Sequence, residues 1–198
     1  MILKKNKSWK SEFAHLFEDS LSYINKQRRY IYLIILIFFT SSIFGFIYSE
    51  KLTFFDNVLK EISDEARNLD FLELIWFIFS NNLTSAVSAL FLGVVFGIFP
   101  IFNAIFNGAI LGYVYSKAIP LAGYSVIWRL LPHGIFELPA IFIALGLGIH
   151  IGTSFFAVRK IKTFRLRFNN SFKAFLTVVL PLLCLAAIIE SFLISFTG

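Results

Sequence analysis

The stretch Leu131–Gly152, LPHGIFELPAIFIALGLGIHIG, decides the fold of this chain. It is a long apolar run that begins with a histidine and a carboxylate, His133 and Glu137, one helical turn apart. Ionisable residues inside a membrane segment are rare, face a bundle interior or a cavity, and count as functional candidates by default. The stretch therefore predicts a buried membrane span with a candidate site at its start.

The composition extends this interpretation to the whole chain. The 198 residues are 58% hydrophobic and only 15% charged, whereas a soluble domain is about a quarter charged. Several mostly apolar stretches reach about twenty residues, the length of a membrane-crossing helix, and the short alternating segments of a β-barrel do not occur. The single cysteine, Cys184, excludes an internal disulfide and a multi-cysteine metal site. The sequence predicts an all-α, polytopic membrane protein.

Five spans are expected, together with a cytoplasmic amphipathic and basic segment over residues 1–29 and a single transmembrane domain over residues 30–198. The predicted spans are Tyr30–Tyr48, Phe71–Phe99, Ile101–Lys117, His133–Phe156 and Phe172–Phe196. Two flanking segments carry apolar residues at helical spacing and are expected to lie on the membrane surface as interfacial helices. Their apolar residues are Trp9, Phe13, Leu16, Phe17, Leu21 and Ile24 before the first span, and Phe55, Val58, Leu59, Ile62 and Ala66 after it.

Basic residues predict the orientation. Seven precede the first span and five lie between the fourth and fifth: Lys4, Lys5, Lys7, Lys10, Lys26, Arg28 and Arg29, then Arg159, Lys160, Lys162, Arg165 and Arg167. The segment from Glu50 to Asp70 is mainly acidic. Basic loops stay in the cytoplasm, so we expect a cytoplasmic N-terminus and an outer C-terminus. The first apolar run starts near residue 30 and lacks a small-residue cleavage site, so a signal peptide is not expected.

Small residues recur every four positions in three spans. The stripes are Ser85, Ala89, Gly93 and Gly97; Ala104, Gly108 and Gly112; and Ala140, Ala144, Gly148 and Gly152. Such stripes let helix backbones approach closely in lipid. The pattern predicts a compact core of the second, third and fourth spans, with Gly93, Gly97, Gly108, Gly112, Gly148 and Gly152 as its packing positions.

The polar residues of the spans gather toward the predicted outer half. His133 and Glu137 share a face with the small stripe of their span, and Glu190 falls at a similar depth in the fifth span. Asn103 and Asn107 lie one turn apart in the third span. Convergence of Glu137, Glu190 and His133, with Glu73, Arg129 and Lys117 as further candidates, predicts one polar site open to the outside, and Asn107 is expected in the environment of Glu137. His150, near the cytoplasmic end, is expected to be separate.

Several motifs resemble the stage II sporulation protein M family. They are the asparagines Asn81 and Asn82, the run Asn107–Gly112, and Pro132–Ala140 (PHGIFELPA) followed by Gly146, Gly148 and Gly152. The resemblance covers about residues 30–196. It implies an integral membrane protein of bacteria or archaea; the namesake is the membrane partner of peptidoglycan-degrading proteins during engulfment. Relatives in circular-bacteriocin gene clusters are linked to maturation, export or immunity.

Three functions remain open at this point. The first is a membrane scaffold or accessory subunit in which His133 and Glu137 fix helix packing. The second is a transporter or translocation component that uses Glu137 and Glu190. The third is an intramembrane hydrolase or peptide cyclase that uses His133 and Glu137. Glu137 is then a general base, or a zinc ligand together with His133, and Asn107 an oxyanion donor.

The sequence leaves any metal or cofactor undetermined. His133, Glu137 and Glu190 are the candidate metal ligands, but a catalytic zinc ordinarily needs three protein ligands and water. No H-E-x-x-H or G-x-S-x-G motif occurs, and whether the chain is an enzyme stays open. Membrane lipids and protein partners or a second copy are the expected partners, and nucleic acid is not.

Overall fold

The structure is a computed structural model that describes residues 9–66 and 69–197, with side chains over 12–66, 69–125 and 134–195. All regular elements in these residues are helices. In chain order they are α1 (Trp9–Lys26), α2 (Arg28–Ile47), η1 (Ser49–Lys51), α3 (Phe54–Ala66), α4 (Phe71–Leu92), α5 (Ile98–Ala122), α6 (Ser125–Gly152), η2 (Thr153–Phe156), α7 (Lys160–Ala174), the π-helical turn η3 (Phe175–Val179) and α8 (Leu180–Thr197). The prediction of an all-α protein is confirmed.

Five of the described helical segments are long and apolar enough to cross a membrane, as predicted. Their boundaries differ from the predicted ones where the chain turns tightly. The second span ends at Leu92 and the third begins at Ile98, because Phe96 and Gly97 adopt positive φ angles of 54° and 72° and reverse the chain. The last span is continuous with a basic helix, so that α7, η3 and α8 form one long segment.

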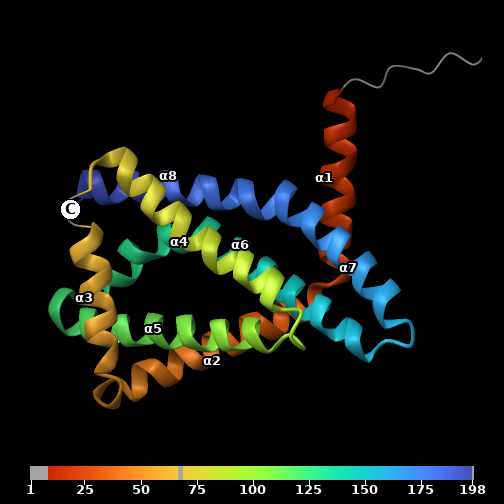
Figure 1. The fold of residues 1–198 in the computed structure, drawn as a ribbon. Helices are drawn as coiled ribbons and strands as arrows, with labels where there is room; N and C mark the ends of the chain where they lie inside the picture. Colours follow the sequence, from red (N-terminus) through yellow and green to blue (C-terminus); the bar gives the residue numbers. More distant parts are fainter. Residues whose placement is uncertain (1–8, 67–68, 198) are drawn as a thin grey trace, which may run out of the picture.

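The two predicted surface helices form, and they lie at opposite ends of the bundle. Figure 1 shows α1 at one end of the spans, where it contacts α7, and α3 at the other end. We call the first the basic end, defined by Lys26, Arg28, Arg29 and the basic residues of α7, and the second the acidic end, defined by the acidic residues of α3. On α1, Phe13, Phe17 and Leu21 are exposed.

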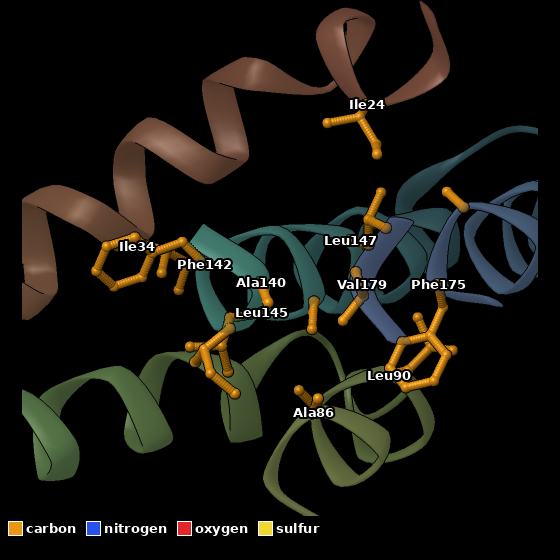
Figure 2. Close-up of a cluster of buried hydrophobic side chains, with 14 of the residues drawn as sticks. Ile24, Ile34, Ala86, Leu90, Ala140, Phe142, Leu145, Leu147, Phe175 and Val179 are labelled. Atoms are coloured by element: carbon orange, nitrogen blue, oxygen red, sulfur yellow. The ribbon is translucent and has the colours of Figure 1, made fainter. Parts of the chain in front are cut away.

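Helix α6 is the centre of the fold. It packs against α2, α4, α5 and α8. Most of its apolar stretch is buried, whereas only a small part of that of α2 is buried. Figure 2 shows Ala140, Phe142, Leu145 and Leu147 of α6 among side chains from neighbouring helices, which are Ile34, Ala86, Leu90, Phe175 and Val179. The span that the sequence marked by its polar start is thus the most enclosed one.

The stripes of α4 and α6 pack against each other as predicted. An added Cβ at Gly93 would lie 2.6 Å from the carbonyl oxygen of Gly148, and one at Gly148 would meet the backbone of Ala89. An added Cβ at Gly152 would meet the backbone of Gly93 and Gly97. The absence of side chains at these positions is what allows α4 to lie directly on α6.

The third stripe packs against the first span, which the predicted core of the second, third and fourth spans did not include. Gly108 faces the backbone of Phe38 and Gly112 faces Ser42, both on α2. In Figure 1, α2 and α5 run side by side, and Ser41 donates a 2.6 Å hydrogen bond to the carbonyl of Ile105. The physical reason is that α2 has its own small residues at Ser41, Ser42 and Gly45. The glycine contacts therefore join α4 to α6 and α5 to α2, and both pairs meet at α6.

Candidate functional site

The structure brings Glu137 and Glu190 together in the half of the bundle near the acidic end. Glu137 lies early in α6 and Glu190 late in α8, and because these helices run in opposite directions their carboxyl groups reach a similar depth. The two groups interact electrostatically. One turn before Glu190, Ala187 packs against Leu74 and Ile78 of α4, which fixes the level of that carboxyl.

One atom of this pair is left without a polar partner. Among the described residues, Oε2 of Glu190 is buried and has no hydrogen bond. Two carboxyl groups that share a low-dielectric site cannot both carry a charge cheaply, so one proton or a cation is the simplest way to neutralise the pair. The chemistry available at Glu137 and Glu190 is therefore binding of a proton or of a cation.

His133 and Arg129 lie outside the residues whose side chains the structure describes. Within the described residues, no group of three or more His, Cys, Asp or Glu side chains is placed to hold a metal ion. The predicted metal ligands His133, Glu137 and Glu190 therefore stay a prediction. The same holds for catalysis by Glu137, His133 and Asn107.

Asn107 is placed in a hydrogen-bond chain between α5 and α4. Its Nδ2 donates to the carbonyl of Asn103 at 3.0 Å and to Oδ1 of Asn103 at 3.1 Å. Asn103 in turn donates to Oγ of Ser85 at 3.0 Å. The recorded partners of Asn107 are thus on α5 and, through Asn103, on α4. This chain is a polar link between two helices whose glycine stripes face elsewhere.

Two further candidates have local roles at the acidic end. Glu73 closes a capping box with Asp70, since each side chain accepts a hydrogen bond from the other residue's backbone. Lys117 lies over the ring of Tyr113, 5.3 Å from its centroid. Tyr113 is fully buried and donates a 2.7 Å hydrogen bond to Asp56 of α3. These contacts hold the surface helix α3 and cap α4.

A polar cluster at the basic end was not predicted from the sequence. Nη1 of Arg167 donates to the carbonyl of His150 at 2.8 Å and to Oγ1 of Thr153 at 2.7 Å. The rings of Tyr23 and Tyr30 lie 6.0 Å and 5.3 Å from the His150 ring. Five residues from α1, α2, α6, η2 and α7 thus meet at one point.

Tyr23 is the contribution of α1 to this cluster. Its hydroxyl donates to the carbonyl of Arg167 at 3.2 Å and lies 3.2 Å from Oγ of Ser171. Burial raises the pKa of Tyr23, while the hydrogen bond with Ser171 and the charge of Arg167 act in the opposite direction. From the sequence, the basic residues of this end indicate only the orientation, and Tyr23 has no distinguishing pattern, so these residues were not grouped.

These observations define a class of protein: a polytopic α-helical membrane protein built around one enclosed span, with a carboxyl pair near one end and a cationic cluster at the other. The family profile described as stage II sporulation protein M matches residues 34–194, and the chain belongs to that family. This confirms the resemblance noted from the motifs around Glu137.

One relative among curated proteins is similar in part. It is an uncharacterized protein of Methanocaldococcus jannaschii, 29% identical over 134 residues, which cover 63% of this chain and 59% of the relative. The chain thus spans about three fifths of the length of that relative. No solved structure matches the chain.

Proposed function

We propose that this chain is a membrane scaffold or accessory subunit of a membrane complex, acting in cell-envelope remodelling or in peptide maturation. We propose further that its N-terminus and basic end face the cytoplasm and its C-terminus faces outside, on the basis of the distribution of basic residues. The precedent for the role is the family's namesake, a membrane partner of peptidoglycan-degrading proteins.

The observation that carries this proposal is the packing around α6. At Gly93, Gly148 and Gly152 the backbones of α4 and α6 are in direct contact. Neither helix can therefore shift along the other without a backbone clash. The contacts at Gly108 and Gly112 restrict α5 and α2 in the same way. Packed interfaces of this kind are not continuously deformable. A rigid bundle that carries surface helices at both ends suits a platform for other proteins.

The test is complementation of a host strain that lacks the gene. A scaffold is expected to tolerate Glu137→Gln, which keeps shape and hydrogen bonding but removes the charge, and also His133→Ala. Gly148→Leu, which separates α4 from α6, is expected to abolish complementation. Exposed Glu61→Gln serves as the matched control for loss of one carboxylate. A Glu137→Gln protein that reaches the membrane at the normal level yet fails to complement would contradict the scaffold function.

The second candidate, a transport or translocation component, is favoured by the carboxyl pair itself. An acidic pair inside a span, with one buried oxygen lacking a hydrogen bond among the described residues, is typical of a proton relay or a cation site. Purified protein in liposomes loaded with a pH-sensitive dye tests this function. Proton-linked flux lost in Glu137→Gln and Glu190→Gln, and kept in Glu61→Gln, would favour it over the scaffold; wild-type liposomes without flux would exclude it.

A further inference from the structure

Two arginine side chains, those of Arg29 and Arg167, take part in the polar cluster at the basic end. Nη2 of Arg29 donates a 2.8 Å hydrogen bond to the hydroxyl of Tyr30. That hydroxyl lies 3.3 Å from Oγ1 of Thr153, which accepts a 2.7 Å hydrogen bond from Arg167. A chain of two hydroxyl groups therefore links the two guanidinium groups, and both also interact electrostatically with His150.

The recorded partners of both guanidinium groups are uncharged. Arg167 donates to a backbone carbonyl and a hydroxyl, and Arg29 donates to a hydroxyl and lies over the Tyr30 ring, 4.7 Å from its centroid. Two guanidinium charges separated by only two hydroxyl groups repel each other unless a counter-ion is bound. Each arginine also keeps further N–H donors beyond those used in these bonds. The cluster thus has both the charge and the donors to bind an anion.

The segment that supplies the partners of Arg167 also contains two buried polar atoms without a recorded hydrogen bond. Among the described residues, Nδ1 of His150 and Oγ of Ser154 are buried and have no hydrogen-bond partner. The two residues are 7% and 1% exposed and lie one turn apart, His150 in the last turn of α6 and Ser154 in η2. Buried polar atoms of this kind are ordinarily satisfied by an ordered water or a ligand. They indicate that the cluster is completed by a polar group from outside the chain.

The cluster lies where two spans end. Arg29 is in the first turn of α2, and His150 is in the last turn of α6. Arg29 is exposed, and the next turns of α2 expose Tyr32, Leu33 and Leu36 by 63%, 42% and 65%. A cationic group followed along the same helix by exposed apolar side chains matches the order of a lipid molecule, headgroup first and acyl chain next.

We propose that Arg29 and Arg167 form a binding site for a phosphate group, with the headgroup of an anionic phospholipid or free phosphate as its source. Arginine binds phosphate through paired, charge-assisted hydrogen bonds, and basic pockets between membrane helices bind anionic headgroups. Because the site joins α1, α2, α6 and α7, an occupied site holds the surface helix α1 and the basic helix α7 to the bundle.

The experiment measures lipid binding to the purified full chain by native mass spectrometry. The probes are phosphatidylglycerol, phosphatidylcholine with the same acyl chains, and inorganic phosphate. Wild-type protein is expected to retain phosphatidylglycerol in preference to phosphatidylcholine. Arg29→Gln and Arg167→Gln are each expected to lower affinity by about tenfold, the effect of losing one charge-assisted partner. The matched controls Arg28→Gln and Arg165→Gln remove the same charge from exposed neighbours and are expected to bind as wild type.

The source of the phosphate group is read from competition. If phosphatidylglycerol stays bound in millimolar inorganic phosphate, the site belongs to a lipid. If phosphate displaces the lipid and by itself stabilises the protein against heat as much as the lipid does, the site belongs to the free ion. Equal binding of phosphatidylglycerol by Arg29→Gln and Arg28→Gln would overturn the proposal. Since Arg167 also ties α7 to α6, its variant can fail to fold, and the variants of the exposed Arg29 then decide. Arg29→Lys keeps the charge but loses the paired guanidinium donors, so it should bind phosphatidylglycerol at an intermediate level.

Discussion

Gly148→Ala is the most direct test of the contact between α4 and α6. The added methyl group would lie 2.8 Å from Cγ of Pro100 and 3.1 Å from the carbonyl carbon of Ala89, and closer still to the Ala89 oxygen. Ordinary contacts begin near 3.4 Å, so the helices must separate. Overpacking of this kind costs about 1–3 kcal/mol. Because the clash is with backbone atoms of Ala89 in a packed helix, no side-chain rotation relieves it.

The matched control is Gly134→Ala in the same helix. Its added Cβ would meet only the flexible end of Leu138, at 3.0 Å and 3.5 Å. Both variants gain the same helix propensity, about 1 kcal/mol over glycine, so the difference between them isolates the packing term. We expect Gly148→Ala to unfold about 2–12 °C below Gly134→Ala, at about 2–4 °C per kcal/mol for a chain of this size.

The assay is size-exclusion chromatography of detergent-solubilised protein after heating, read by the fluorescence of a fused tag. Gly108→Ala tests the contact of α5 with α2 in the same way, since its Cβ would meet the backbone of Phe38. If Gly148→Ala melts within a degree or two of Gly134→Ala, the two helices are not in backbone contact and the argument for a rigid bundle fails.

Three further predictions concern the ends of the bundle. Cysteines placed at Ser63 and Arg165, in a background without the native cysteine, should be labelled from opposite sides of sealed cells, with Ser63 outside; labelling from one side refutes the five-span orientation. Tyr113→Phe should lower the free energy of unfolding by about 1–2 kcal/mol, because the bond to the Asp56 carboxylate is lost; an unchanged melting temperature counts against that bond. Burial raises the pKa of Tyr23 above its usual 10.0, so its stabilising contribution is complete below pH 10.0 and is lost as the pH rises through the raised value. Tyr23→Phe should flatten this alkaline loss in a melting-temperature profile, and an identical profile would show that Tyr23 is not buried.

The helices were predictable because their signals are local. Apolar length alone locates the five spans, and helical spacing of apolar residues locates α1 and α3. Which helix each span packs against was not predictable in the same way. The stripe at Gly108 and Gly112 shows that a backbone comes close but not which one. The matching small positions Ser42 and Gly45 lie in a span without a stripe of three small residues at four-residue spacing.

The carboxyl pair and the cationic cluster show the same contrast. Chain direction and depth were enough to predict that Glu137 and Glu190 lie at a similar level. The cluster around Arg167 draws on five elements, and each of its residues has an ordinary explanation when considered alone. Only the tertiary contacts of His150 with Tyr23 and Tyr30 reveal that these residues form one group.

The pairing of α2 with α5 has a consequence for how the chain enters the membrane. Phe38 and its contact Gly108 are 70 positions apart in the sequence, so at about 5–20 residues per second the ribosome takes roughly 4–14 s to deliver the partner. If α2 enters the bilayer before α5 is made, Ser41, Ser42 and Gly45 face acyl chains through that interval. The mean hydropathy of α2, 2.2, allows it to persist there alone. Assembly therefore follows insertion in two stages, and a membrane chaperone that covers the small face of α2 would shorten the exposed interval.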